Sequence, residues 1–286
     1  MILHGFSSVL ICIAALSGVE EHPLSMDKPL RISEVRAEPA EARIFERVTL
    51  EIGLDASYTN PFRSREIRVD VEAASEEGNA FTAPAFLYQP FERRLSEAGE
   101  GTNEILTPAG APRWQARLSF PEPGDYTLRV TAHDASGTVS SHAVEITVSS
   151  ADVPGMARRH PEEHRYFVTD RGKSLYLIGA NVCWAGARGT YDYDDWLPKY
   201  AEANCNFFRV WLSPSWTTFA MNTVSSGYDG IALGNAWRLD YVLEQAERFG
   251  QRIMVCIDSF NILRTKERLW DVGGFALYRD TRRTAG

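Results

Sequence analysis

Residues 176–184 read Tyr-Leu-Ile-Gly-Ala-Asn-Val-Cys-Trp, and residues 206–212 read Asn-Phe-Phe-Arg-Val-Trp-Leu. A third run, residues 252–258, reads Arg-Ile-Met-Val-Cys-Ile-Asp. Each run is apolar and closes with polar or aromatic residues, which is typical of buried parallel strands that carry a ligand site at their carboxyl ends. Because helical periodicity fills the segments between the runs, the pattern predicts the first three strands of a (β/α)8 TIM barrel.

Local signals set the expected bounds of these elements. We expect strands over residues 177–182, 207–212 and 253–258, and a first helix over residues 194–203. Asp192 or Asp194 would cap the first helix, with Pro198 in its first turn. Asn235 would cap the second helix, and Gly250 would end it.

Side chains at the carboxyl ends of barrel strands usually build the active site. The candidate substrate-binding residues by this criterion are Asn181, Trp184, Arg209, Trp211, Asp258 and Asn261. A charge inside an apolar run needs a partner, so Arg209 predicts a fixed carboxylate beside it. The alternative is an outward Arg209 that pairs with a helix. The tryptophans could stack on sugar rings or pack inside the barrel.

Residues 30–148 follow a different period. Apolar residues alternate with polar ones over residues 48–54, 67–73, 114–120, 126–132 and 144–148, and Gly, Pro and Asn turns separate these runs. Such alternation places one face of each strand on a core and the other in water, so we predict an immunoglobulin-like antiparallel β-sandwich. Four aromatic residues could form either a sugar-binding face or part of its core: Phe86, Tyr88, Phe91 and Trp114.

The composition limits the partners and the compartment. The chain has 286 residues and a formal net charge of −8 without a Lys/Arg cluster, so nucleic acid is a poor partner. Residues 6–19 are apolar but too short for a membrane span, and they favour a signal peptide cut near Gly18, with a buried strand or a misassigned start as alternatives. We therefore expect a secreted or periplasmic protein. The expected organisation is a signal peptide (1–18), a β-sandwich (30–150), a linker (151–163) and a partial barrel (164–286).

The cysteines and histidines predict neither a disulfide framework nor a metal site. Cys12 lies in the expected leader, and Cys183, Cys205 and Cys256 sit in or beside apolar runs, as buried thiols do. His160 and His164 form a weak pair in the polar linker. No cofactor is expected.

Several blocks of sequence resemble a known pair of modules. The first set comprises residues 58–62, 84–90, 106–108, 114 and 121–130. The second set comprises residues 178–184, 196–202, 205–214, 235–243 and 256–259. The first set is similar to an amino-terminal sandwich module of the type called domain of unknown function 5060, and the second resembles the opening of the cellulase-like barrel that follows it.

The resemblance implies a retaining glycoside hydrolase of the cellulase superfamily acting on β-linked polysaccharide. Its two catalytic Glu residues would end the fourth and seventh strands, about 5–5.5 Å apart, and Arg209 matches an arginine that braces the nucleophile. The given sequence stops before a fourth strand, and residues 271–286 depart from the family pattern. We therefore expect an inactive amino-terminal fragment. The alternative is a non-catalytic secreted sandwich for glycan binding or interdomain packing.

Overall fold

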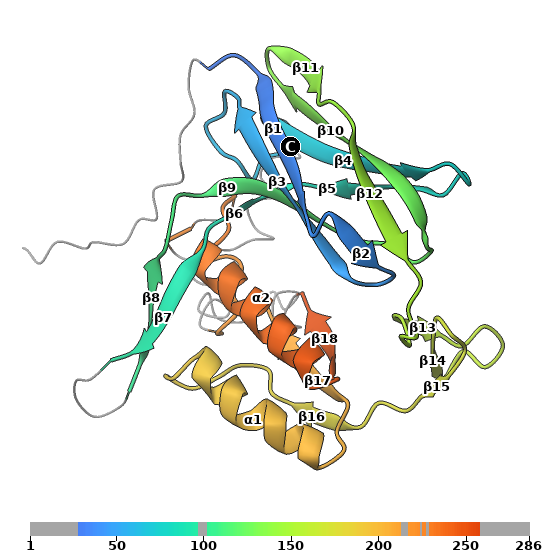
Figure 1. Ribbon diagram of the computed structural model, residues 1–286. Helices are drawn as coiled ribbons and strands as arrows, with labels where there is room; N and C mark the ends of the chain where they lie inside the picture. Colours follow the sequence, from blue (N-terminus) through green and yellow to red (C-terminus); the bar gives the residue numbers. More distant parts are fainter. Residues whose placement is uncertain (1–27, 97–101, 213–216, 224, 227–228, 258–286) are drawn as a thin grey trace, which may run out of the picture.

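The computed structural model describes residues 28–96, 102–212, 217–223, 225–226 and 229–257. The described chain is mostly β-structure, with two helices (Figure 1). One sheet has the order β1 (Arg31–Glu38), β3 (Arg47–Asp55), β9 (Arg113–Ser119), β6 (Phe86–Tyr88). The second has the order β2 (Glu41–Arg43), β12 (Val144–Ser149), β10 (Gly124–Asp134), β4 (Ile67–Ser75), β5 (Ala80–Pro84), and β11 (Gly137–Ser140) pairs with β10.

These two sheets share one hydrophobic core, and we call them together the two-sheet unit. Val48 and Leu50 of β3 belong to the same buried cluster as Val71 of β4 and Leu128 of β10. Buried and exposed side chains alternate along β4 and β10, as the period of two predicts. The pairing is antiparallel except between β12 and β2, which run parallel.

A two-stranded ribbon leaves this unit and reaches the helices. It consists of β7 (Phe91–Leu95) and β8 (Glu104–Pro108), which pair with each other and lie in the sequence between β6 and β9. Figure 1 shows this ribbon, which we call the arm, extending beside α1 and α2. A further small sheet consists of β13 (Ala157–Arg159), β14 (Phe167–Thr169) and β15 (Ser174–Leu175). The predicted linker, residues 151–163, therefore includes a paired strand.

The α/β part follows the predicted alternation. Its order is β16 (Gly179–Asn181), α1 (Thr190–Glu202), β17 (Phe207–Trp211), α2 (Leu233–Arg248), β18 (Arg252–Cys256). The three strands form a parallel sheet in the order β16-β17-β18. Fully buried Phe208 and Val210 of β17 belong to one cluster with Leu197 of α1 and Val242 of α2. The described residues form no closed barrel, and each strand is shorter than we predicted.

The predicted N-cap residues of both helices are wrong, whereas the prediction that Gly250 ends α2 is confirmed, since α2 stops at Arg248 and Gly250 has a φ of 65°. Helix α1 begins at Thr190 after Gly189 and has no side-chain cap of its own, and Pro198 lies inside it. Instead Glu104 of the arm accepts hydrogen bonds from the backbone N–H and the hydroxyl of Thr190. Helix α2 begins at Leu233, and the Asn235 side chain donates to the carbonyl oxygen of Ala220 at 2.8 Å.

Arg93, a partly buried cation, makes several of the contacts that hold the arm against the helices. The Arg93 guanidinium lies between the rings of Tyr191 and Tyr241, 4.0 and 3.9 Å from their centroids. It also donates to Asp194 Oδ2 at 2.7 Å and to the Thr190 hydroxyl at 2.9 Å. The arm therefore joins the two-sheet unit to α1 and α2 through partly buried, charge-assisted hydrogen bonds.

A second set of contacts joins β9 directly to α2. Arg117 forms a bidentate ion pair with Asp240, at 2.6 and 2.8 Å, and its guanidinium lies 5.0 Å from the centroid of the Phe86 ring. Phe91 contacts the Trp237 ring, with 6.3 Å between their centroids. Of the four aromatic residues considered for a sugar-binding face, Trp114 is buried. Phe91 contacts α2 directly, and Phe86 lies against the guanidinium of Arg117 within its own sheet.

Candidate functional site

The carboxyl edge of the parallel sheet brings four of the predicted site residues together. Asn181 pairs in register with Arg209, so the two side chains project from the same face of the sheet. The Arg209 guanidinium lies 5.5 Å from the Trp211 ring centroid. Trp211 in turn meets Trp184 edge to face, with centroids 5.5 Å apart and planes inclined by 62°. Asp258 and Asn261 lie outside the described residues.

The face that carries these residues is the one opposite the helices. Alternation along β17 turns Phe208 and Val210 toward the helices and therefore turns Arg209 and Trp211 to the other side. On that side Met254, the register partner of Arg209 in β18, is 45% exposed, and Trp184 is 42% exposed. A ligand could therefore approach the edge from this face.

Two buried donors at this edge have no hydrogen-bond acceptor in the described chain. They are Nε of Arg209 and Nε1 of Trp211. A buried donor without an acceptor is unfavourable. The carboxylate partner that the sequence predicts for Arg209 is not found among the described residues. The edge therefore offers N–H donors and aromatic rings, which suit a ligand or a segment rich in oxygen acceptors.

Other predicted features have the following outcomes. Cys183, Cys205 and Cys256 are free thiols, and Cys183 is buried. The described residues contain no group of His, Cys, Asp or Glu suited to hold a metal ion. In that same part of the chain, no helix has the length and apolar character needed to cross a membrane.

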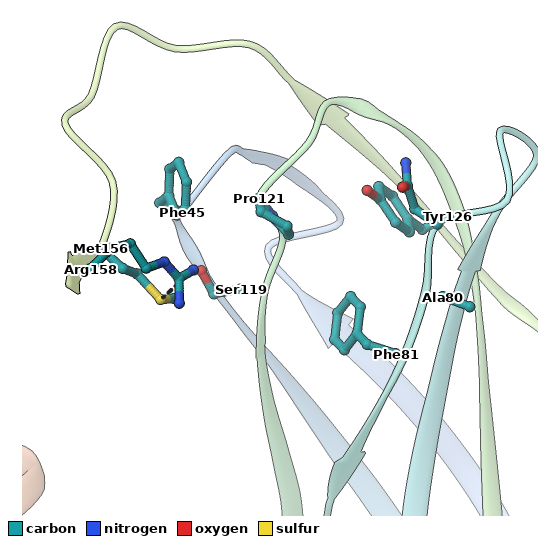
Figure 2. Close-up of a pocket in the computed structure, with 9 residues that line it drawn as sticks. Phe45, Ala80, Phe81, Ser119, Pro121, Tyr126, Met156 and Arg158 are labelled. Atoms are coloured by element: carbon teal, nitrogen blue, oxygen red, sulfur yellow. Dashed lines mark hydrogen bonds between the residues drawn. The ribbon is translucent and has the colours of Figure 1, made fainter. Parts of the chain in front are cut away.

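Sequence reasoning missed two constellations. The first is the set of arm contacts at Arg93 and Glu104, whose partners lie about a hundred residues away and leave no local pattern. The second is a pocket lined by Phe45, Phe81 and Tyr126 beside the β13 strand, shown in Figure 2. An aromatic residue in a turn, such as Phe45, was the one available signal.

Comparison with known proteins gives a likeness of fold. No protein-family model matches the sequence, and no curated protein matches it. A candidate glycoside hydrolase from Bacteroides vulgatus superposes with a TM-score of 0.51 at 16% identity, covering 76% of this chain and 41% of that protein. The match to a family 39 glycoside hydrolase from Bacteroides cellulosilyticus covers 78% of this chain and 33% of that protein, at 12% identity and a TM-score of 0.21. The chain thus shares its fold with part of a candidate glycoside hydrolase and spans 41% of that protein's length.

Proposed function

We propose that this chain is the amino-terminal part of a secreted retaining glycoside hydrolase that acts on β-linked polysaccharide. The observation that carries the proposal is Arg209, whose Nε is buried without an acceptor at the carboxyl edge of a parallel sheet, beside Trp211. The fold shared with a candidate glycoside hydrolase and the resemblance of the sequence blocks support it. In this proposal residues 30–150 are an immunoglobulin-like sandwich, and residues 164–286 begin a TIM barrel.

Arg209 would position a catalytic carboxylate rather than react itself. A guanidinium forms strong paired hydrogen bonds with a carboxylate and favours its ionised form, which a nucleophile requires. Retaining hydrolysis needs two carboxyl groups about 5–5.5 Å apart. No carboxylate of the described chain pairs with Arg209, so we expect the chain as given to bind glycan at this edge without cleaving it.

Trp184 and Trp211 would supply the sugar-stacking surface. The two rings meet at an angle and Trp184 is 42% exposed, and its exposed part would contact a pyranose ring. Asn181 lies in register with Arg209 and would contribute an amide to the sugar hydroxyls. Asp258 and Asn261 would extend the same edge from the third strand.

The alternative function is a non-catalytic sandwich module, which would either bind glycan or pack against the neighbouring part of the chain. One observation favours the packing role. Phe91 contacts Trp237 of α2, and Phe86 lies against Arg117, which pairs with Asp240 of α2. These aromatic residues therefore serve the contact between the two parts of the chain rather than an open sugar-binding face.

The test uses affinity electrophoresis of the full chain in gels that contain soluble β-1,3- or β-1,4-glucan. We expect retardation of the wild-type chain, less retardation of Trp184→Ala and recovery in Trp184→Phe. The matched control is Trp237→Phe, which changes a tryptophan at the junction and should migrate as wild type.

A reducing-sugar assay on the same glucans should show no turnover. Hydrolysis with retained anomeric configuration would show that the chain is active as given. Equal retardation of wild type and Trp184→Ala would remove the sheet edge from the proposal.

A further inference from the structure

A pocket lies between the two-sheet unit and the β13–β14–β15 sheet, on elements that take no part in the parallel-sheet edge (Figure 2). Its volume is about 340 Å³, within the range of roughly 300–1,000 Å³ that is typical of small-molecule sites. Phe45 and Phe81 supply partly exposed aromatic walls, and Tyr126, which is 1% exposed, also lines the pocket. Asn79, Ser119 and Arg158 supply polar groups.

The wall formed by β13 is fixed by one carboxylate. Asp170 accepts a hydrogen bond from the backbone N–H of Met156 at 2.6 Å and another from Arg158 Nε at 2.6 Å. The hydrogen bond from Arg158 is the main reason that the pKa of Asp170 lies below its ordinary value. Arg158 is thus held in place with its charge neutralised.

The opposite wall is held close by unusual backbone. Phe45 has a φ of 64°, which a bulky side chain rarely adopts, and its N–H donates to the carbonyl oxygen of Phe120 at 2.8 Å. Gly155 has a φ of 75°, and a Cβ there would lie 3.0 Å from Cζ of Phe45. The close approach of the two walls therefore depends on glycine at position 155.

One polar atom of the pocket lining has no hydrogen-bond partner in the part of the chain that the structure describes. The Ser119 hydroxyl is buried and has no hydrogen-bond partner among the described residues. It is the kind of unpaired buried group that a ligand hydroxyl would satisfy. Because the guanidinium of Arg158 is already paired with Asp170, the polar lining carries no excess charge, and an uncharged ligand fits it better than an anion.

We propose that this pocket binds one uncharged pyranose unit of a glycan. The apolar face of the sugar ring would lie on the aromatic walls, since flat apolar surfaces pack well on such rings. Its hydroxyls would bond to Ser119 and to the Asn79 amide, both of which donate and accept. The site is separate from Trp184 and Arg209, so it stands whether or not the barrel edge binds sugar.

The experiment is saturation-transfer NMR of the full-length Trp184→Ala variant, which lacks the proposed stacking surface of the sheet edge, with methyl β-glucopyranoside, methyl β-xylopyranoside and methyl β-galactopyranoside, each tested alone. We expect transfer from at least one of them, with a dissociation constant on the order of millimolar, as suits a ligand of this size. Ala80 lines the pocket and is exposed, so Ala80→Phe should fill the pocket and abolish transfer. Ala143→Phe, at an exposed position outside the pocket lining, should leave transfer unchanged.

A second variant keeps the test open if Ala80→Phe fails to fold. Ser119→Ala removes the unpaired hydroxyl, so its melting temperature should stay the same or rise, while binding weakens about five-fold. The proposal is overturned by no transfer from any of the three pyranosides, or by transfer that persists in Ala80→Phe. It is also overturned by tighter binding of cinnamate than of the sugars.

Discussion

Arg93 of the arm should be among the most sensitive positions for the stability of this protein. Changing Arg93 to Ala removes a charge-assisted hydrogen bond to Asp194, worth about 1.5–3 kcal/mol. It also removes two ring contacts, at 4.0 and 3.9 Å, worth about 0.5–1 kcal/mol each. The free energy of unfolding should therefore fall by about 3–4 kcal/mol, a large share of the roughly 5–15 kcal/mol that domains possess.

Urea unfolding measures this loss of stability. Arg94, the neighbour of Arg93 in the sequence, provides the control. Arg94 is exposed in the same strand, so Arg94→Ala should change the free energy of unfolding by no more than about 0.5 kcal/mol. Arg93→Lys should recover less than half of the loss, because an ammonium group neither stacks between two rings nor forks to two acceptors. Equal unfolding midpoints for Arg93→Ala and Arg94→Ala would refute the reasoning.

Two further predictions concern stability. The pKa of Glu66 is lowered from its ordinary value of 4.5 to about 2, chiefly by the hydrogen bond from the Thr59 hydroxyl. Its carboxylate therefore stabilises the fold above pH 4.5 and loses this effect as the pH falls toward 2. In the Glu66→Gln variant, the melting temperature should depend less on pH between pH 4.5 and pH 2. An equally steep pH dependence in the variant and the wild type would contradict this. The Tyr193 hydroxyl donates to the buried carbonyl oxygen of Val182 at 2.6 Å. Tyr193→Phe should thus cost about 1–2 kcal/mol in urea unfolding, and a gain in stability would count against it.

The strands were predictable where burial follows a simple period. In β4 and β10, apolar and polar residues alternate because one face of each strand lies on the core and the other lies in water. This alternation can be read from the sequence alone. The α/β order was predictable too, because Phe208 and Val210 sit in a run of apolar residues. Helix starts were not, since α1 takes its cap from Glu104, eighty-six residues earlier in the chain. A contact between residues so far apart in the chain leaves no local sequence pattern from which it could be predicted.

The sequence predicts where the candidate site lies, at the carboxyl edge of the parallel strands, but it does not predict which groups interact there. Parallel strands place Asn181, Arg209 and Trp211 at one edge once the strands are recognised. The sequence also suggested that Arg209 needs a carboxylate partner. Which residue provides that carboxylate depends on the three-dimensional fold around Arg209 and cannot be read from the local sequence. The pocket at Phe45 was missed because its walls come from segments far apart, which only the packing of β13 against the two-sheet unit brings together.

The arm has a consequence for synthesis on the ribosome. Arg93 contacts the hydroxyl of Tyr241, 148 residues further along the chain. At about 5–20 residues per second, a bacterial or eukaryotic ribosome needs roughly 7–30 s to translate that interval. Until Tyr241 has been made, the set of contacts around Arg93 cannot be complete. The two-sheet unit can form first, and the nascent arm then waits for the helices that complete it.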